Sequence, residues 1–311
     1  MTHLSRRSIT AALGSALMAG SAMARHRGPH PDAPRTTKAP PHARWRMGLQ
    51  LWTVNAEMKA NPVATLKAVK ALGFETVETA GLYGMSAATL RTHIEDAGLA
   101  CKSYHAGMAD LIASPEAHMA NARTLGAAWI VCASPRTPGP LDPSKPWLEA
   151  MYSAMTLDAW KQNAAHLAEL APLAQKSGLT LAYHNHPMEF RDWNGVTGYS
   201  LLAGSSDALR FELDIGWVVA GGHDPLPILR QYAGRIDLLH VKDMIRDASA
   251  PLGWRSVEIG RGAIGWGPVM AMARATGVKG YFVEQEPPYL RPVMESLRIS
   301  AEEIRRSKSF R

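Results

Sequence analysis

The feature that most constrains the fold is a unit that repeats along the chain: a short apolar strand, a polar or glycine-containing loop, and an amphipathic helix. The apolar runs predict strands at residues 47–52, 75–79, 99–105, 128–132, 179–184, 210–214, 236–240 and 280–284. The helical spacing of apolar residues predicts helices at 62–72, 86–97, 115–125, 157–177, 197–203, 225–232, 268–276 and 292–306. Eight units in about 265 residues match the number and size of a single (β/α)8 TIM barrel, an α/β fold.

A doubly wound parallel sheet is the alternative α/β fold, and the turn after the first strand argues against it. Such sheets usually carry a glycine-rich first turn that binds phosphate. Here the first strand is followed by Trp52, Thr53, Val54 and Asn55, without a glycine. The doubly wound sheet would also need fewer strands, so the barrel is the fold we predict.

Residues 1–24 have the layout of an export signal. Arg6 and Arg7 precede a weakly apolar run at 9–20, and Ala22-Met23-Ala24 is a small-x-small cleavage site. This resembles a bacterial twin-arginine signal, which predicts export of the protein to the periplasm. The apolar run is too short to span a bilayer as a stable helix, so we expect no membrane span after processing.

Residues 25–46 are rich in Pro, Arg and His and predict a disordered linker, which leaves 47–311 as the barrel domain. Residues 1–46 contain eight of the 34 Lys and Arg residues and one of the 27 Asp and Glu residues. The barrel domain therefore has 26 residues of each sign and no net charge. This balance argues against a nucleic-acid partner.

Ionisable side chains collect at the carboxyl ends of the predicted strands, the end at which TIM barrels carry their active sites. The residues are Glu78, His105, His184, Asp214, His240 and Glu284, with Lys242, Asp243 and Glu286 close behind. Random surface charge would not gather at one end of the repeated unit. The sequence therefore predicts a small-molecule site at this end of the barrel.

The densest group of ligand-type side chains follows the fifth strand. His184 and His186 should share one face of the strand because side chains alternate, and Pro187 discourages further pairing. Glu189 follows at once. Imidazoles and a carboxylate at a strand end suit either a metal site or acid–base chemistry.

Several carboxylates that meet at one barrel mouth repel one another, and a divalent cation would neutralise them. The mixed oxygen and nitrogen donors suit Mn²⁺, Co²⁺, Mg²⁺ or Zn²⁺. The alternative is a ring of salt bridges at the top of the barrel without a metal.

At these residues the chain resembles the sugar phosphate isomerase/epimerase group of the xylose-isomerase-like TIM barrels. The similar segments are 48–52, 73–78, 182–186 with Glu189 and Phe190, 211–214, 239–243, 258–262 and 283–285. They are spread over residues 47–305, and together they are specific for the superfamily although each alone is weak.

The resemblance implies one divalent metal held by a Glu, an Asp, a His and a second Glu. Asp214, His240 and Glu284 match three of these positions. The fourth position, at the end of the fifth strand, holds His184 instead of a Glu. We expect Glu189 to fold back and supply the missing carboxylate, which leaves His184 for proton transfer; the converse assignment remains open.

The implied chemistry is enolisation: the metal polarises the carbonyl of a hydroxy-carbonyl sugar and stabilises an enediolate. His184 or Glu284 would move the proton, Lys242 would hold a developing oxyanion, and His105 would meet a substrate hydroxyl. The predicted substrate-binding residues are Glu78, His186, Trp217, Glu258 and Arg261. Candidates for stacking on a sugar face are Trp52, Trp217, Trp254 and Trp266.

We therefore predict a metal-dependent isomerase or epimerase of an unphosphorylated sugar or keto-sugar, because the sequence offers no phosphate cradle. Two alternatives use the same barrel: a lyase or dehydratase of a keto-glycoside or cyclitol, and a periplasmic sugar-binding protein without catalysis. An endonuclease-IV-like enzyme would need more metal ligands and a basic surface. The family resemblance also implies a homo-oligomer.

Overall fold

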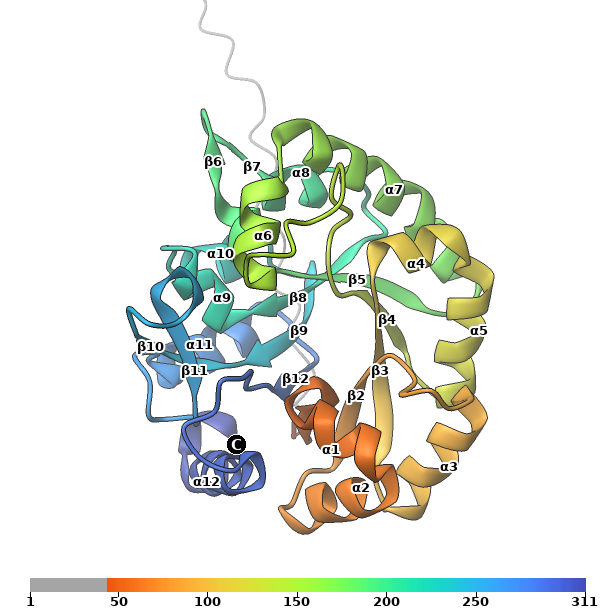
Figure 1. The fold of residues 1–311 in the computed structure, drawn as a ribbon, viewed down its shortest axis with the longest axis vertical. Coiled ribbons are helices and arrows are strands. Elements are labelled where there is room, and N and C mark those ends of the chain that lie inside the picture. Colours follow the sequence, from red (N-terminus) through yellow and green to blue (C-terminus); the bar gives the residue numbers. More distant parts are fainter. Residues whose placement is uncertain (1–43) are drawn as a thin grey trace, which may run out of the picture. The chain divides into compact units, whose positions relative to one another are not determined.

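The structure is a computed structural model that describes residues 44–311, drawn in Figure 1. The predicted export signal at 1–24 and the predicted linker up to residue 43 lie outside the described residues. Among residues 44–311, no helix combines the length and the apolar character that crossing a lipid bilayer requires.

The described strands form a closed barrel in the order β1-β12-β9-β8-β5-β4-β3-β2. Their bounds are β1 Met47–Gln50, β2 Thr76–Ala80, β3 Ala100–Ala106, β4 Trp129–Cys132, β5 Thr180–His184, β8 Arg210–Asp214, β9 Ile236–Val241 and β12 Gly280–Val283. Every neighbouring pair is parallel, and β1 pairs with both β2 and β12, which closes the ring. The predicted (β/α)8 barrel is thereby confirmed.

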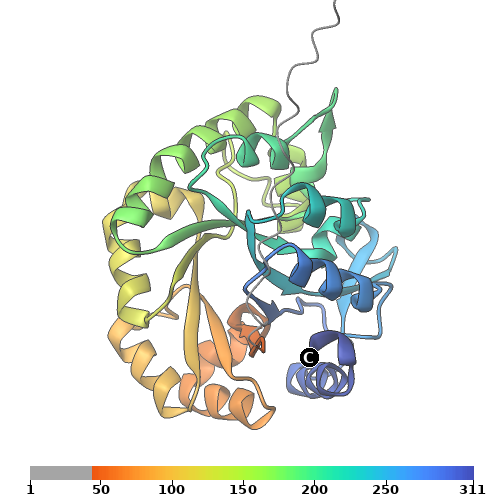
Figure 2. The same ribbon diagram turned by 180° about the vertical axis from the view of Figure 1, so that it is seen from behind.

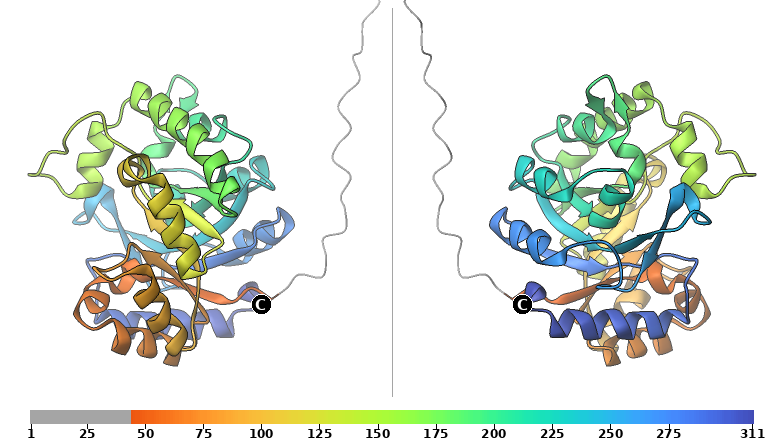
Figure 3. Two further views of the ribbon diagram at one scale, coloured as in Figure 1. Left: turned by 90° about the vertical axis from the view of Figure 1, so that its right-hand side faces the viewer. Right: turned by 90° about the vertical axis from the view of Figure 1, so that its left-hand side faces the viewer.

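Helices surround the strands, as both face views show (Figures 1 and 2). Their bounds are α1 Asn55–Ala60, α2 Pro62–Ala71, α3 Ala87–Asp96, α4 Met108–Ala113, α5 Pro115–Leu125, α6 Trp147–Ala154, α7 Leu157–Lys176, α8 Gly198–Ala203, α9 Ile215–Ala220, α10 Pro225–Gln231, α11 Trp266–Ala275 and α12 Val293–Arg306. Arg305 on α12 donates a hydrogen bond to the Leu72 carbonyl at the end of α2 (2.6 Å), so the last helix meets one of the first (Figure 3).

Apolar burial explains why these segments form a barrel. Leu49, Val77, Ile130 and Leu213 are fully buried on four different strands, and burying a large apolar side chain contributes about 1.5–3 kcal/mol each. Gly48 allows close packing between β1 and β12, because a Cβ there would lie 2.6 Å from the Tyr281 carbonyl oxygen.

Several short elements at the carboxyl end were not predicted: α1, α4, α6, α9 and two hairpins. The hairpins pair β6 (Asp192–Trp193) with β7 (Val196–Thr197), and β10 (Asp243–Arg246) with β11 (Trp254–Val257). Elements of this length are marginal alone and depend on tertiary packing, which a periodicity argument does not detect.

The amino end of the barrel is covered by aromatic side chains. Trp45 is 9% exposed and its ring meets Tyr281 edge-on at 6.1 Å between centroids. Phe310 lies 5.6 Å from the Tyr281 ring, and the Arg274 guanidinium lies 4.2 Å from the centre of the Trp45 ring. Residues 44–46, which the sequence placed in the linker, therefore contact the barrel, and the folded domain begins before residue 47.

Candidate active site

Six of the ionisable side chains predicted at the strand ends lie at the carboxyl end of the barrel. Glu78 is on β2, His105 on β3, His184 on β5, Asp214 on β8 and His240 on β9, and Glu284 follows β12 directly. All six are more than nine-tenths buried. They come from strands far apart in the sequence, so barrel closure is what brings them together.

Four of these residues form a group with the geometry of a metal site. One ligand atom from each of His184, Asp214, His240 and Glu284 lies within 4.8 Å of the corresponding atom of the others. His240 Nδ1 lies 2.9 Å from Glu284 Oε2 and 3.6 Å from Asp214 Oδ2. Two imidazoles and two carboxylates are a donor set that suits Zn²⁺, Mn²⁺ or Co²⁺.

His184 provides the observation that tests this fit. Its Nδ1 is buried and has no hydrogen-bond partner among residues 44–311. A buried polar atom without a partner is costly unless a ligand or water satisfies it. The donor set therefore fits a divalent cation, and His240 must be neutral to bind it, so metal binding and proton release are coupled.

Glu189, predicted as the fourth ligand, has other partners. Its carboxylate accepts a hydrogen bond from the Tyr183 hydroxyl (2.7 Å) and another from the His186 backbone N–H (2.9 Å), which closes the 3-10 turn η2, Pro187–Phe190. Within the described part of the chain it belongs to neither group of close ligand atoms. The geometry favours the converse assignment, with His184 as the ligand, and Glu189 as a ligand stays a prediction.

Lys242 is fully buried beside the same carboxylates. Its Nζ lies 2.6 Å from Glu286 Oε1, 2.8 Å from Glu284 Oε2 and 3.0 Å from Asp214 Oδ2. Burial alone would lower the pKa of Lys242, but the three carboxylates raise it above its ordinary value. The ammonium also lies 4.3 Å from the centre of the Trp217 ring, so Trp217 packs on Lys242.

A second layer of charge lies beneath the metal group. Glu212, fully buried on β8, places Oε2 2.8 Å from His105 Nε2 and 3.1 Å from His240 Nε2. Glu78 Oε1 lies 2.9 Å and 2.7 Å from the same two nitrogens and accepts a hydrogen bond from Gln50 Nε2 (2.7 Å). His105, His184, Glu212 and His240 also form a second group of close ligand atoms.

These contacts shift the ionisation of the inner layer. Burial lowers the pKa of His105, but the carboxylates of Glu78 and Glu212 raise it overall to about 9. Burial raises the pKa of Glu212, but His240 and His105 lower it overall to about 2. The inner carboxylates thus hold the His240 ring in place through Nε2 while Nδ1 faces the metal group, an arrangement typical of metal-binding histidines.

His184 and His186 have the opposite electrostatics. Burial, with His240 as the next cause, lowers the pKa of His184 well below its ordinary value. Burial, with Lys242 as the next cause, lowers the pKa of His186 to about 3. Both imidazoles are therefore neutral near pH 7, the form that binds metals or accepts hydrogen bonds.

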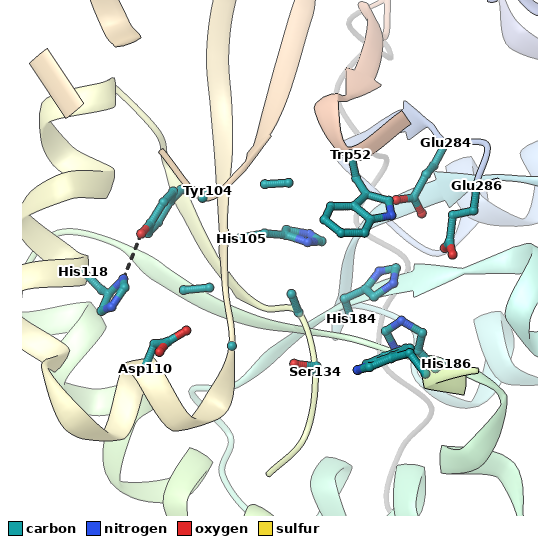
Figure 4. Close-up of a pocket in the computed structure, with 16 residues that line it drawn as sticks. Trp52, Tyr104, His105, Asp110, His118, Ser134, His184, His186, Glu284 and Glu286 are labelled. Atoms are coloured by element: carbon teal, nitrogen blue, oxygen red, sulfur yellow. Dashed lines mark hydrogen bonds between the residues drawn. The ribbon is translucent and has the colours of Figure 1, made fainter. Parts of the chain in front are cut away.

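A cavity of about 610 Å³ opens over the site. Its lining includes His105, His184, His186, Glu284 and Glu286, and Figure 4 shows these side chains with Trp52 at one side of the cavity. The carboxylates and imidazoles thus face a space that admits a small molecule.

Other predicted substrate-binding residues lie away from this lining. Glu258 is 2% exposed and accepts a hydrogen bond from Ser296 on α12 (2.7 Å), with Arg291 as its ion-pair partner. Arg261 is exposed, and neither it nor Trp217 lines the cavity. Their roles in substrate binding stay predictions.

Three residues of the site were not predicted as such from the sequence: Glu212, Trp147 and Glu286. Glu212 had a readable signal, because it lies two residues before Asp214 on the same strand and therefore faces the same side. Glu286 was noted near the eighth strand but given no role. Trp147 had no signal, because a long loop brings it to the cavity, where its ring meets His186 at 5.1 Å.

Comparison with known proteins agrees with this architecture. A model of the xylose isomerase-like TIM barrel family matches residues 66–309. An inosose dehydratase of Bacillus cereus (strain AH820) is 28% identical over 163 residues, which cover 46% of this chain and 53% of the dehydratase. The chain thus spans about half the length of the curated relatives it matches.

Solved structures show the same fold. A sugar phosphate isomerase/epimerase from Parabacteroides distasonis ATCC 8503 is similar with a TM-score of 0.69 at 21% identity, over 88% of this chain and 98% of the other. The IOLI protein with a bound zinc atom is similar with a TM-score of 0.58 at 17% identity, over 83% and 95%. At these identities the likeness shows the fold alone.

Proposed function

The chain belongs to the xylose isomerase-like TIM barrel family, and we propose from this premise that it is a divalent-metal-dependent isomerase or epimerase. Its substrate would be an unphosphorylated sugar or keto-sugar. The observation that carries the proposal is the group formed by His184, Asp214, His240 and Glu284, which fits a cation. Two of its members, His184 and Glu284, line the cavity.

These four residues would hold the metal. When bound, the cation supplies Lewis-acid chemistry, which polarises a carbonyl and makes the neighbouring C–H more acidic. The zinc in the structure of the IOLI protein supports a divalent metal in this kind of barrel, without fixing which one binds here.

Proton transfer needs groups on the cavity wall that do not serve mainly as ligands. Glu286 lines the cavity, and burial raises its pKa although Lys242 opposes this shift. His186 lines the same part of the cavity with a buried Nδ1 that has no hydrogen-bond partner within residues 44–311. A carboxylate and an imidazole from different loops would serve as acid and base on two sides of a substrate.

The two residues predicted as bases, His184 and Glu284, serve mainly as metal ligands in this proposal. His184 becomes a ligand, and Glu284 remains close to the reacting atoms as a ligand that lines the cavity. Lys242 is saturated by three carboxylates, so we propose that it keeps them ionised and oriented rather than holding an oxyanion.

The lining supports an unphosphorylated substrate. Among the described residues that line the cavity there is no Lys or Arg. A phosphate group is usually bound by such cations or by a cradle of backbone N–H groups. Trp52 and Trp147, about half exposed at the cavity, instead offer faces on which a sugar ring could stack.

A dehydratase of a keto-sugar or cyclitol is the second candidate, and the similarity to inosose dehydratase favours it. The same abstraction next to a carbonyl leads to elimination when a hydroxyl at the β-carbon leaves as water. We also propose, from the motif at Arg6 and Arg7, that the protein acts in the periplasm.

The test is metal analysis of the purified protein, with His184→Ala beside Glu189→Ala. We expect about one divalent metal per chain in wild type and in Glu189→Ala, and loss of the metal in His184→Ala. Metal loss only in Glu189→Ala would reverse the ligand assignment. Wild type that binds no Mn²⁺, Co²⁺ or Zn²⁺ would overturn the mechanism.

Catalysis is then assayed in deuterated water with a panel of free aldoses, ketoses, 3-keto-sugars and inososes. A product that takes up deuterium and keeps the elements of water indicates isomerisation or epimerisation. A product that has lost water indicates the dehydratase. High activity on sugar phosphates together with none on free sugars would contradict the proposed substrate class.

A further inference from the structure

The cavity extends beyond the residues that carry the proposed chemistry. One part, the catalytic half, is lined by His184, His186, Glu284 and Glu286. The other part, the distal half, is lined by Tyr104, Asp110, His118 and Ser134. Figure 4 shows Tyr104, Asp110 and His118 on one side of the cavity and the catalytic half on the other, with His105 and Ser134 between them.

The size of the cavity exceeds the need of a single sugar ring. Its volume is about 610 Å³. Pockets of about 300–1,000 Å³ enclose drug-sized ligands, which are larger than a monosaccharide. A single ring at the metal group would leave the distal half to water.

The distal half carries hydrogen-bonding groups that the proposed chemistry does not use. Asp110 is an exposed residue and Ser134 is half-buried; both line the cavity, and Figure 4 shows the Asp110 carboxylate directed into it. His118 Nδ1 is 2.8 Å from the Tyr104 hydroxyl, which fixes the ring and leaves Nε2 for a ligand. A carboxylate, a hydroxyl and an imidazole are the groups that bind sugar hydroxyls.

Gly107 separates two of these groups. A Cβ added there would lie 3.3 Å from Asp110 Oδ2 and 3.6 Å from Ser134 Oγ. Its φ of −70° suits any residue, so conformational freedom does not require glycine at this position. The missing side chain keeps the space between the carboxylate and the hydroxyl open to a ligand.

The geometry points to a second sugar subsite in the distal half, so that the substrate is a keto-disaccharide or similar glycoside rather than a free monosaccharide. This inference rests on the proposed function for the position of the reacting ring. The reacting ring occupies the catalytic half. The second ring is joined to it by the glycosidic bond, and its hydroxyls donate hydrogen bonds to Asp110 and Ser134. Trp147, at the cavity beside His186, offers a face to the linked rings.

The first test is binding to the metal-loaded full-length protein by isothermal titration. The probes are glucose, methyl β-glucoside, cellobiose, maltose and trehalose. We expect at least one disaccharide to bind about tenfold more tightly than glucose, as two added hydrogen bonds would give. The methyl glucoside should bind like glucose.

Gly107→Ala and Asp110→Asn test the position of the subsite. The disaccharide advantage is the ratio by which a disaccharide binds more tightly than glucose. Each variant should remove most of this advantage and leave glucose affinity within about twofold, because neither residue lines the catalytic half. The matched controls are Gly265→Ala, where an added Cβ has no neighbour within 4 Å, and Asp158→Asn, an exposed residue in the first turn of α7. Both controls should keep the full advantage.

Other outcomes overturn the subsite. They are equal binding of glucose and all disaccharides, no disaccharide binding at all, or equal weakening of both ligands by Gly107→Ala. A phenyl glucoside that binds better than every disaccharide would exclude a second sugar and assign the distal half to an aromatic group. Failure of the proposed function gives a different result: no deuterium exchange on any sugar while the disaccharide advantage persists.

Discussion

The two ends of the barrel are built from the same eight strands and follow opposite rules. At the amino end, Trp45, Tyr281 and Phe310 form a continuous aromatic contact. At the carboxyl end, His184 and Glu212 keep buried polar atoms without partners among residues 44–311. The amino end packs apolar and aromatic side chains and stabilises the fold, whereas the carboxyl end gathers buried charged groups and leaves some of their polar atoms without a protein partner.

Stability and function therefore depend on opposite ends of the barrel. Charged groups buried together oppose folding unless they are paired or bind a cation. The carboxyl end tolerates them because Lys242 and the imidazoles offset the carboxylates, and the apolar strands and the aromatic cover supply the stability. Substitutions at the amino end should therefore change the free energy of unfolding, and substitutions at the carboxyl end should change turnover or metal binding.

Glu284→Gln should produce the largest effect and should act on catalysis. The change removes a proposed ligand charge, and Lys242 keeps Asp214 and Glu286 as partners. We expect turnover to fall about 10³-fold, because the Lewis acid contributes several kcal/mol, while the free energy of unfolding changes little. Steady-state kinetics and urea unfolding measure the two quantities, with the exposed Glu295→Gln as control. A loss of stability without loss of activity would erase the contrast between the ends.

Trp45→Ala should show the reverse at the amino end. Removing a buried Trp leaves a cavity against Tyr281 and costs roughly 3 kcal/mol of unfolding free energy. Turnover at a temperature where the variant is folded should match wild type. Trp147→Ala is the matched control, because Trp147 is 47% exposed and lines the cavity. It should keep stability and change KM, and a KM defect in Trp45→Ala would contradict the separation.

Glu212→Gln tests whether the inner layer positions His240. The Glu212 carboxylate lies 3.1 Å from His240 Nε2, and loss of such a partner typically weakens metal binding about 10- to 100-fold. Metal titration should detect the shift, and excess metal should restore activity, which a purely structural defect would not allow. Glu169→Gln, exposed on α7, serves as control. Unchanged metal affinity would show that Glu212 only fills the barrel interior.

The same comparison explains what the sequence could predict. Strand 210–214 was predicted with its observed bounds, and the other seven within two residues at each end, because eight apolar runs leave few topologies. The carboxyl-end residues were predictable because strand ends converge in this fold. The aromatic cover of Trp45 was missed because residues 25–46 read as a linker by composition, and contact with Tyr281 depends on tertiary packing.

The choice between His184 and Glu189 lay beyond sequence reasoning for a different reason. Both side chains belong to the same turn, and the spacing allows either to reach the metal group. The assignment depends on whether the turn Pro187–Phe190 directs Glu189 toward the metal group or lets it form hydrogen bonds within the turn. The Tyr183 hydroxyl and the His186 N–H satisfy Glu189 within the turn, and neither bond is visible in a pattern of residue types.

Glu189 also supplies the smallest predicted effect, since it lies at the carboxyl end and behaves as a structural group. Burial raises the pKa of Glu189 to about 8 from its ordinary value of 4.5, although hydrogen bonds from Tyr183 and His186 oppose the shift. Its contribution to stability is therefore complete below about pH 4.5 and is lost as the pH rises through 8, because the folded state must then release a proton from a buried site. In Glu189→Gln the neutral form is permanent, so the stability difference between variant and wild type should move in favour of the variant between pH 5 and pH 9. Urea unfolding across that range measures the difference, and a difference that stays constant with pH would show that Glu189 is ionised throughout, as a metal ligand would be.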